Sequence, residues 1–160
     1  MGGTMTTLVV LSDTHGNHEA IDKLSQIFEE SDYIIHLGDV SSDMRGLASR
    51  YPQKTYRVIG NCDFSYEKDE MTLEVEGHRI FFCHGHKYGV KSDLKKLVSR
   101  AKELGCDIAL YGHTHEKKIE EIDGVLTINP GCLTRYTLQK SYCYLCIHKD
   151  KVVPTLVDLA

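Results

Sequence analysis

Tyr111-Gly112-His113-Thr114-His115 closes an apolar run that begins at Ile108, and it places two histidines one residue apart. An apolar run that stops at a glycine predicts a buried strand ending in a loop. Because residues i and i+2 of an extended segment share one face, we expect both imidazoles to point at the same spot. Two neutral imidazoles that converge at a strand end make a good pair of metal ligands. The alternative is that both histidines are half-exposed loop residues without a metal. The metal interpretation therefore requires that the ends of the other strands supply further ligands.

Polar side chains of ligand type also follow the other predicted buried strands. The apolar runs are 7–11, 33–37, 55–59 and 79–83, and they are followed by Asp13 and His15, Asp39, Asn61, and His84. In open α/β sheets, sites form outside the carboxyl ends of the strands. Each of these residues alone also fits a turn or a helix cap. Taken with His113 and His115, the set predicts one shared metal site.

The remaining patterns predict helices and hairpins between these strands. Apolar residues recur at helical spacing in 19–30 and 94–104, and a short helix is expected through Leu47 and Ala48. Alternation in 71–76 predicts a strand with one face partly open to water. Hairpins are expected at 76–78, at Asp123-Gly124 and at 149–151. This order of elements predicts an α/β fold.

The composition is that of an ordinary globular protein, and we expect a single domain over residues 1–160 with 1–5 as a flexible extension. The net charge of −4 and the lack of a basic tract argue against stable binding of duplex nucleic acid. No apolar run is long enough to span a membrane, and the N-terminus lacks the features of a signal peptide. We therefore expect a cytoplasmic chain whose cysteines are reduced. Cys143 and Cys146 have zinc-like spacing but would face opposite sides of a strand, so they are expected to be apolar filler.

The predicted ligand set favours two adjacent metal ions. Two aspartates, one asparagine and four histidines are too many for one tetrahedral zinc site. Oxygen and imidazole ligands suit Mn²⁺ first, and also Fe, Zn²⁺, Ni²⁺ or Co²⁺. Two divalent ions and two carboxylates leave a positive pocket, which attracts an anion such as a phosphate ester. A water held between two such ions loses its proton near neutral pH and becomes a nucleophile.

The motifs resemble those of the calcineurin-like metallophosphoesterases, and in particular the small bacterial and archaeal phosphodiesterase branch. They are Asp13-x-His15, Gly38-Asp39, Gly60-Asn61, His84-Gly85, Gly112-His113-Thr114-His115 and the late Ile128-Asn129-Pro130-Gly131. The resemblance is nearly full length and implies a four-layer α/β/β/α sandwich of two mixed sheets flanked by helices. It also implies a division of ligands. One ion would be held by Asp13, His15 and His115, the other by Asn61, His84 and His113, and Asp39 would bridge them.

One position departs from the family pattern. Many members carry a histidine after the Gly-Asn pair, where it contacts the phosphate, whereas this chain carries Cys62. A thiol is a poorer acid–base group at neutral pH, which leaves open what protonates the leaving group. His86 could take that role, or it is a loop histidine beside a ligand. Asp63 could orient His15 or another ligand, or it caps a turn. His36 lies within a strand and is expected to pack rather than to ligate.

The sequence therefore leads to the hypothesis of a metal-dependent phosphodiesterase with a dinuclear centre and a metal-bridging hydroxide, acting on a small phosphodiester. Asp39, Asn61 and His86 are the residues expected to take part in catalysis, with Cys62 and Asp63 close to them. Two alternatives share the fold: a protein-binding scaffold resembling a retromer subunit, and a nuclease of the same superfamily. Substrate specificity is expected to come from loops 41–50, 63–69 and 133–140. The sequence leaves open whether the protein forms a homo-oligomer.

Overall fold

Two five-stranded mixed sheets form the centre of the protein, seen here in a computed structural model that describes residues 5–39, 41–61, 63 and 68–159. The first sheet has the order β10 (Lys151–Leu159), β9 (Lys140–His148), β1 (Thr6–Leu11), β2 (Tyr33–His36) and β3 (Thr55–Arg57). The second has the order β4 (Glu70–Val75), β5 (His78–Cys83), β6 (Ile108–Leu110), β8 (Val125–Asn129) and β7 (Lys118–Ile122). In each sheet three strands are parallel: β1, β2 and β3 in the first, and β5, β6 and β8 in the second.

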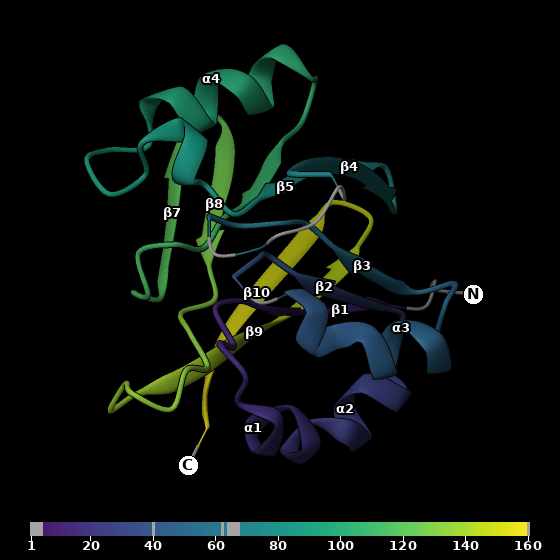
Figure 1. Cartoon of the computed structure of the whole chain (residues 1–160). Coiled ribbons are helices and arrows are strands. Elements are labelled where there is room, and N and C mark those ends of the chain that lie inside the picture. Colours follow the sequence, from purple (N-terminus) through teal and green to yellow (C-terminus); the bar gives the residue numbers. More distant parts are fainter. Residues whose placement is uncertain (1–4, 40, 62, 64–67, 160) are drawn as a thin grey trace.

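Helices cover the outer face of each sheet, so that the molecule has four layers (Figure 1). On the first sheet lie α1 (His18–Lys23), α2 (Ser25–Glu30) and α3 (Arg45–Arg50), the last preceded by a 3₁₀ turn, η1 (Ser41–Met44). On the second lies α4 (Lys95–Glu103), and η2 (His86–Tyr88) is a further 3₁₀ turn. The four-layer α/β/β/α sandwich expected from the sequence is confirmed.

Alternation along β1 shows why the layers hold together. Leu8 and Val10 point into the apolar cluster shared by the two sheets, whereas Val9 and Leu11 point into the cluster beneath α1 and α2. All four side chains are fully buried. Because side chains of a strand alternate between its faces, a strand covered on both faces is apolar at every position. This accounts for the unbroken apolar run at the start of the chain.

The single helix expected over 19–30 is two helices. The chain turns at Leu24, whose N–H bonds to the carbonyl of Ile21, three residues back, at 3.0 Å. This tighter bond changes the helix direction, so that Ile21, Leu24 and Phe28 all pack on the first sheet. The stretch contains no glycine or proline, and periodicity alone therefore does not reveal the break.

The described cysteines are free thiols, and Cys143 lies in the core between the sheets, as expected of apolar filler. None of the helices in the described ranges is both long and apolar enough to cross a bilayer.

Candidate metal centre

The carboxyl ends of the parallel strands of both sheets meet at one rim of the sandwich, and the loops that leave them carry the predicted ligands. Two groups of side chains converge there, each with ligand atoms within 4.8 Å of one another. The first group is Asp13, His15, Asp39 and His115, and the second is Asp39, His84 and His113. Asp39 belongs to both groups. The rim follows from the register of β1 with β2 and of β5 with β6, which aligns the ends of neighbouring strands.

The first group has the spacing of ligands around one ion. Nε2 of His15 lies 3.8 Å from Asp13 Oδ1 and 3.7 Å from Asp39 Oδ2, and Nε2 of His115 lies 3.1 Å from Asp13 Oδ1. Ligands bound at about 2.1 Å with angles of 90–120° are separated by roughly 3.0–3.7 Å. His15 Nε2 is buried and has no hydrogen-bond partner in the part of the chain that the structure describes. A buried nitrogen that lacks a partner and faces two carboxylates fits a metal ligand.

The second group adds Asn61 to the side chains that converge there. His84 Nε2 lies 3.3 Å from Asp39 Oδ2 and 3.1 Å from His113 Nδ1. The amide oxygen of Asn61 points at the same atoms, and turning the amide over would bring its nitrogen within 3.1 Å of both His84 Nε2 and Asp39 Oδ1. The turned amide could donate hydrogen bonds, but the orientation with oxygen inward is the one that ligates a cation. Because Oδ2 of Asp39 faces His15 on one side and His84 on the other, this carboxylate is placed to bridge two ions.

His113 and His115 do not point at one spot, and this part of the sequence interpretation is wrong. β6 ends at Leu110, and both histidines have left-handed backbone angles, with φ of 71° and 63°. The loop is therefore not extended, and the i, i+2 rule for strands does not apply to it. His113 turns to His84 in the second group, and His115 turns to Asp13 in the first.

The two carboxylates dominate the electrostatics of the rim. Asp13 and Asp39 have side chains that are 0% and 4% exposed, so two negative charges are buried side by side. A hydrogen bond to Asp13 raises the pKa of His115. Burial opposes protonation of His84, but its hydrogen bond to Asp39 and the charge of Asp13 outweigh burial and raise its pKa. Burial and the neighbouring His84 lower the pKa of His113. Buried carboxylates need cations, which here are protonated histidines or metal ions.

Hydrogen bonds from the backbone fix the carboxylates and the imidazoles. Asp63 Oδ2 accepts hydrogen bonds from the N–H groups of Asp39 at 3.0 Å and Gly60 at 2.7 Å, so Asp63 orients the candidate ligand Asp39. His84 Nδ1 lies 2.9 Å from the carbonyl of Leu37. Because a carbonyl only accepts, Nδ1 carries the proton, and Nε2 is left as the atom that faces the other ligands.

The geometry of this rim agrees with the comparisons to known proteins. The family model of the calcineurin-like phosphoesterase superfamily domain matches residues 6–151. This chain belongs to the calcineurin-like phosphoesterase superfamily. Members of this superfamily use divalent metal ions, and the two groups of side chains are the candidate ligands. The family resemblance noted from the motifs is thereby confirmed.

Relatives and solved structures span nearly the whole chain. The probable metallophosphoesterase YsnB of Bacillus subtilis is 36% identical over 159 residues, which cover 96% of this chain and 91% of that protein. The phosphodiesterase MJ0936 of Methanocaldococcus jannaschii is 31% identical, with 76% of this chain and 81% of the relative covered. The structure of Vacuolar Protein Sorting 29 from Cryptosporidium parvum superposes with a TM-score of 0.85 at 20% identity, over 99% of this chain and 93% of that one. At that identity the last likeness shows the fold alone.

Of the other residues that the sequence singled out, Cys62 lies outside the described residues. His86 opens η2 beside the second group, with its ring centre 5.4 Å from that of His84 and 6.2 Å from that of His113. Its Nδ1 is buried and has no hydrogen-bond partner among the described residues. Burial, His84 and Lys87 lower the pKa of His86.

Sequence reasoning missed two residues that hold the ligands of this phosphoesterase in place. Ser12 Oγ donates to Asp13 Oδ2 at 2.6 Å. Asn129 donates to the hydroxyl of Thr114 at 2.8 Å and to the carbonyl of Gly112 at 3.3 Å, and thereby holds the loop that carries both histidines. In the sequence, Asn129 stands out only as part of a family motif, and a signal for Ser12 exists only in its position one residue before a candidate ligand.

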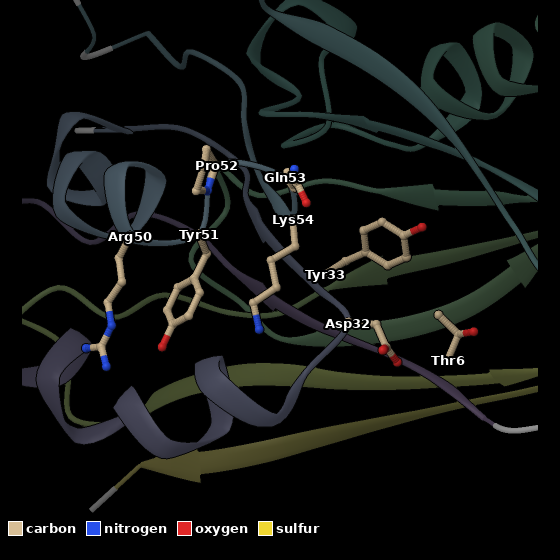
Figure 2. A pocket seen from close by; sticks show the side chains of 8 residues that line it. All are labelled: Thr6, Asp32, Tyr33, Arg50, Tyr51, Pro52, Gln53 and Lys54. Atoms are coloured by element: carbon tan, nitrogen blue, oxygen red, sulfur yellow. The ribbon is translucent and has the colours of Figure 1, made fainter.

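A cavity of about 560 Å³ lies at the opposite end of the first sheet, and several of the polar side chains that line it take part in hydrogen bonds of the fold (Figure 2). The ammonium group of Lys54 donates to the carbonyls of Phe28, Glu29 and Ser31 at the end of α2. Arg50 and Lys54 both lie over the ring of Tyr51 (Figure 2). This arrangement ties α2 to the segment before β3.

Proposed function

We propose that this protein is a metal-dependent phosphodiesterase with a dinuclear centre, Mn²⁺ being the first candidate metal, and a hydroxide between the ions as nucleophile. The single observation that carries the proposal is the position of Asp39 Oδ2 between two sets of ligand atoms, 3.7 Å from His15 Nε2 and 3.3 Å from His84 Nε2. Relatives named metallophosphoesterase and phosphodiesterase, with 31–36% identity, support it.

Each residue has a stated part in the proposal. Asp13, His15 and His115 would hold the first ion, Asn61, His84 and His113 would hold the second, and Asp39 would serve both. When bound, the ions supply Lewis acidity toward the phosphate and an activated water. The protein's share is to hold the donors in place before substrate arrives, with Asp63 fixing the backbone of Asp39 and Ser12 fixing the carboxylate of Asp13. We assign protonation of the leaving group to His86, which lies next to the second ion's ligands.

The space beside the first ion position fits a small phosphodiester. A cavity of about 390 Å³ is lined by His15, His115, Thr134, Tyr136 and Thr137. Tyr136 is almost fully exposed, as is Leu138, so the loop at 133–140 presents apolar groups next to the metal ligands. We propose that one of the two ester groups of the substrate lies against this loop.

The test is hydrolysis of bis(p-nitrophenyl) phosphate by protein stripped of metal and then supplied with Mn²⁺. Activity should require the metal, and Asp39→Asn should abolish it, because an amide cannot serve as a bridging carboxylate. Asp150→Asn is the matched control, since Asp150 is exposed in the turn between β9 and β10. Hydrolysis by Asp39→Asn in the presence of a chelator at the wild-type rate would refute the proposal.

A second measurement examines His86 separately. Loss of a proton donor slows substrates with poor leaving groups more than those with good ones. His86→Ala should therefore slow an alkyl phosphodiester more than the nitrophenyl ester, and equal slowing of both would remove His86 from that role.

The alternative function is a protein-binding scaffold, and this chain shares its fold with Vacuolar Protein Sorting 29. The same hydrolysis assay distinguishes the scaffold from the phosphodiesterase. A scaffold with this fold would bind a partner protein equally well with and without metal and would not turn over the ester.

A further inference from the structure

His36 is a fully buried polar residue at the end of β2, and it belongs to neither ligand group. Both of its ring nitrogens have partners. The backbone N–H of Gly38 donates to Nδ1 at 3.0 Å, and Nε2 lies 3.0 Å from the hydroxyl of Thr14. Gly38 directly precedes the bridging residue Asp39, and Thr14 lies between the ligands Asp13 and His15.

The direction of these hydrogen bonds follows from the donors. An N–H can only donate, so Nδ1 of His36 accepts and the proton of the neutral ring lies on Nε2. Nε2–H then donates to Thr14, and the Thr14 hydroxyl donates to Asp43 Oδ2 at 2.6 Å. The same carboxylate oxygen accepts from the N–H of Gly16 at 2.8 Å. Among the described residues, these hydrogen bonds form a continuous connection from Gly38 to Asp43 between the two ligand loops.

The two loops that the chain connects are strained. Asp13, His15 and Asp39 have φ of 53°, 43° and 63°, in the left-handed region that costs a side-chain-bearing residue about 1 kcal/mol or more. Such angles persist only where neighbouring contacts hold them. The hydrogen bond from the N–H of Asp13 to the carbonyl of Gly38, at 3.0 Å, also joins the two loops.

We infer that Gly38, His36, Thr14 and Asp43 form a positioning relay that sets the distance between the Asp13–His15 loop and Asp39, and through it the affinity of the first metal position. This inference rests on the proposed function only in taking Asp13, His15 and Asp39 as ligands. His36 itself is a positioning residue and touches no substrate.

The charge state of His36 agrees with the relay. Burial lowers its pKa to about 4, although the carboxylates of Asp13, Asp63 and Asp43 act in the opposite direction. The ring is therefore neutral at pH 7, as a ring with one proton on Nε2 must be.

A histidine that merely fills space would behave differently on substitution. Thr14→Val keeps the shape of Thr14 and removes its hydroxyl, and Thr14→Ser keeps the hydroxyl. His36→Leu removes both hydrogen bonds of the ring. Thr127→Val is the matched control, because Thr127 is equally buried, donates to the carbonyl of Glu120 and lies on β8 away from both loops.

The experiment measures Mn²⁺ binding by metal-free protein, with the free ion followed by electron paramagnetic resonance. Loss of a residue that holds a ligand typically weakens metal binding about 10- to 100-fold. We expect a loss of about tenfold or more for Thr14→Val and His36→Leu, and wild-type affinity for Thr14→Ser and Thr127→Val. Thermal unfolding of each variant shows whether it is folded. Wild-type affinity in folded Thr14→Val would overturn the relay.

A second measurement needs no variant and no metal. The ¹⁵N shifts of His36 in the metal-free wild-type protein report which ring nitrogen carries the proton. A proton on Nε2 supports the relay, and a proton on Nδ1 contradicts it. These results are separable from the proposed function. A wild-type protein that binds Mn²⁺ but does not hydrolyse phosphodiesters refutes the function and leaves the relay standing.

Discussion

The buried neutral imidazole of His36 should make the stability of this protein fall in mild acid. Its pKa is about 4 in the folded chain, against 6.5 for the free side chain. Below pH 6.5 the imidazole of His36 takes up a proton in the unfolded chain but stays neutral in the folded chain. Stability contributed by neutral His36 is therefore complete above pH 6.5 and is lost as the pH falls toward 4.

The two pKa values differ by two to three units, and each unit corresponds to about 1.4 kcal/mol, so the greatest possible loss of stability is about 3 kcal/mol. Most of this loss is expected between pH 7.5 and pH 4.5. Other groups titrate over the same range: the pKa values of His78, His84 and His115 are raised, and these residues add stability as the pH falls. The total profile is thus a sum, and a variant is needed to isolate His36.

His36→Gln provides that comparison, because glutamine does not titrate. Urea unfolding with a chelator present, followed by circular dichroism, gives the free energy of unfolding of both proteins at each pH. The free energy of unfolding of wild type, relative to that of His36→Gln, should fall by about 2–3 kcal/mol between pH 7.5 and pH 4.5. A difference that stays constant over this range would show that His36 accepts a proton as readily in the fold as outside it, and the reasoning on its burial would be wrong.

Three further predictions concern other parts of the molecule. Gly60→Ala should reduce Mn²⁺ binding and hydrolysis by about 100-fold, since its Cβ would fall against Asp39 Oδ1 and 2.7 Å from the Asp39 nitrogen. Gly46→Ala in α3, which has nothing within 4 Å, should leave both unchanged. Lys54→Met should lower the free energy of unfolding by about 1–3 kcal/mol without changing hydrolysis, because three carbonyls at the end of α2 lose their donor. Metal removal should lower the melting temperature of wild type, because the folded chain binds the ions and the unfolded chain does not; an unchanged melting temperature would count against a resident metal.

The convergence of the candidate ligands could be predicted because it follows from the topology of the two sheets. Parallel strands end at the same rim, so residues far apart in the sequence, such as Asp13 and His84, meet when each follows its own strand. The prediction needed no side-chain geometry. It required only that apolar runs be strands and that ligand types follow them.

The contacts that orient each ligand could not be predicted in the same way. The sequence left two roles open for Asp63, orienting a ligand or capping a turn. In the structure its carboxylate accepts hydrogen bonds from the backbone N–H groups of Asp39 and Gly60. His36 was expected to pack, and it packs, but its hydrogen bonds to Gly38 and Thr14 depend on the register of β2 with β1. Register and loop conformation come from the tertiary structure, and periodicity carries no information about them.

The left-handed backbone angles at the candidate ligands are the feature that the sequence predicts least. Eight described residues other than glycine have positive φ, and five of them are the candidate ligands Asp13, His15, Asp39, His113 and His115. Glycine would adopt these angles without strain, but it has no ligand atom. The chain therefore keeps the ligand and holds the strained backbone through neighbouring contacts. The N–H of His113 bonds to Asp13 Oδ2, and the N–H of Gly112 bonds to the carbonyl of His84.

The first of these contacts connects a loop of the second sheet to a loop of the first, and the second connects two loops of the second sheet. Because the core beneath them is fully buried, a loop cannot relax its φ angles without moving a strand end. The positions of the candidate ligands are thus set by the sandwich. Ion binding should accordingly change the conformation of the rim loops little. The affinity for metal should then not be reduced by a cost of ordering these loops.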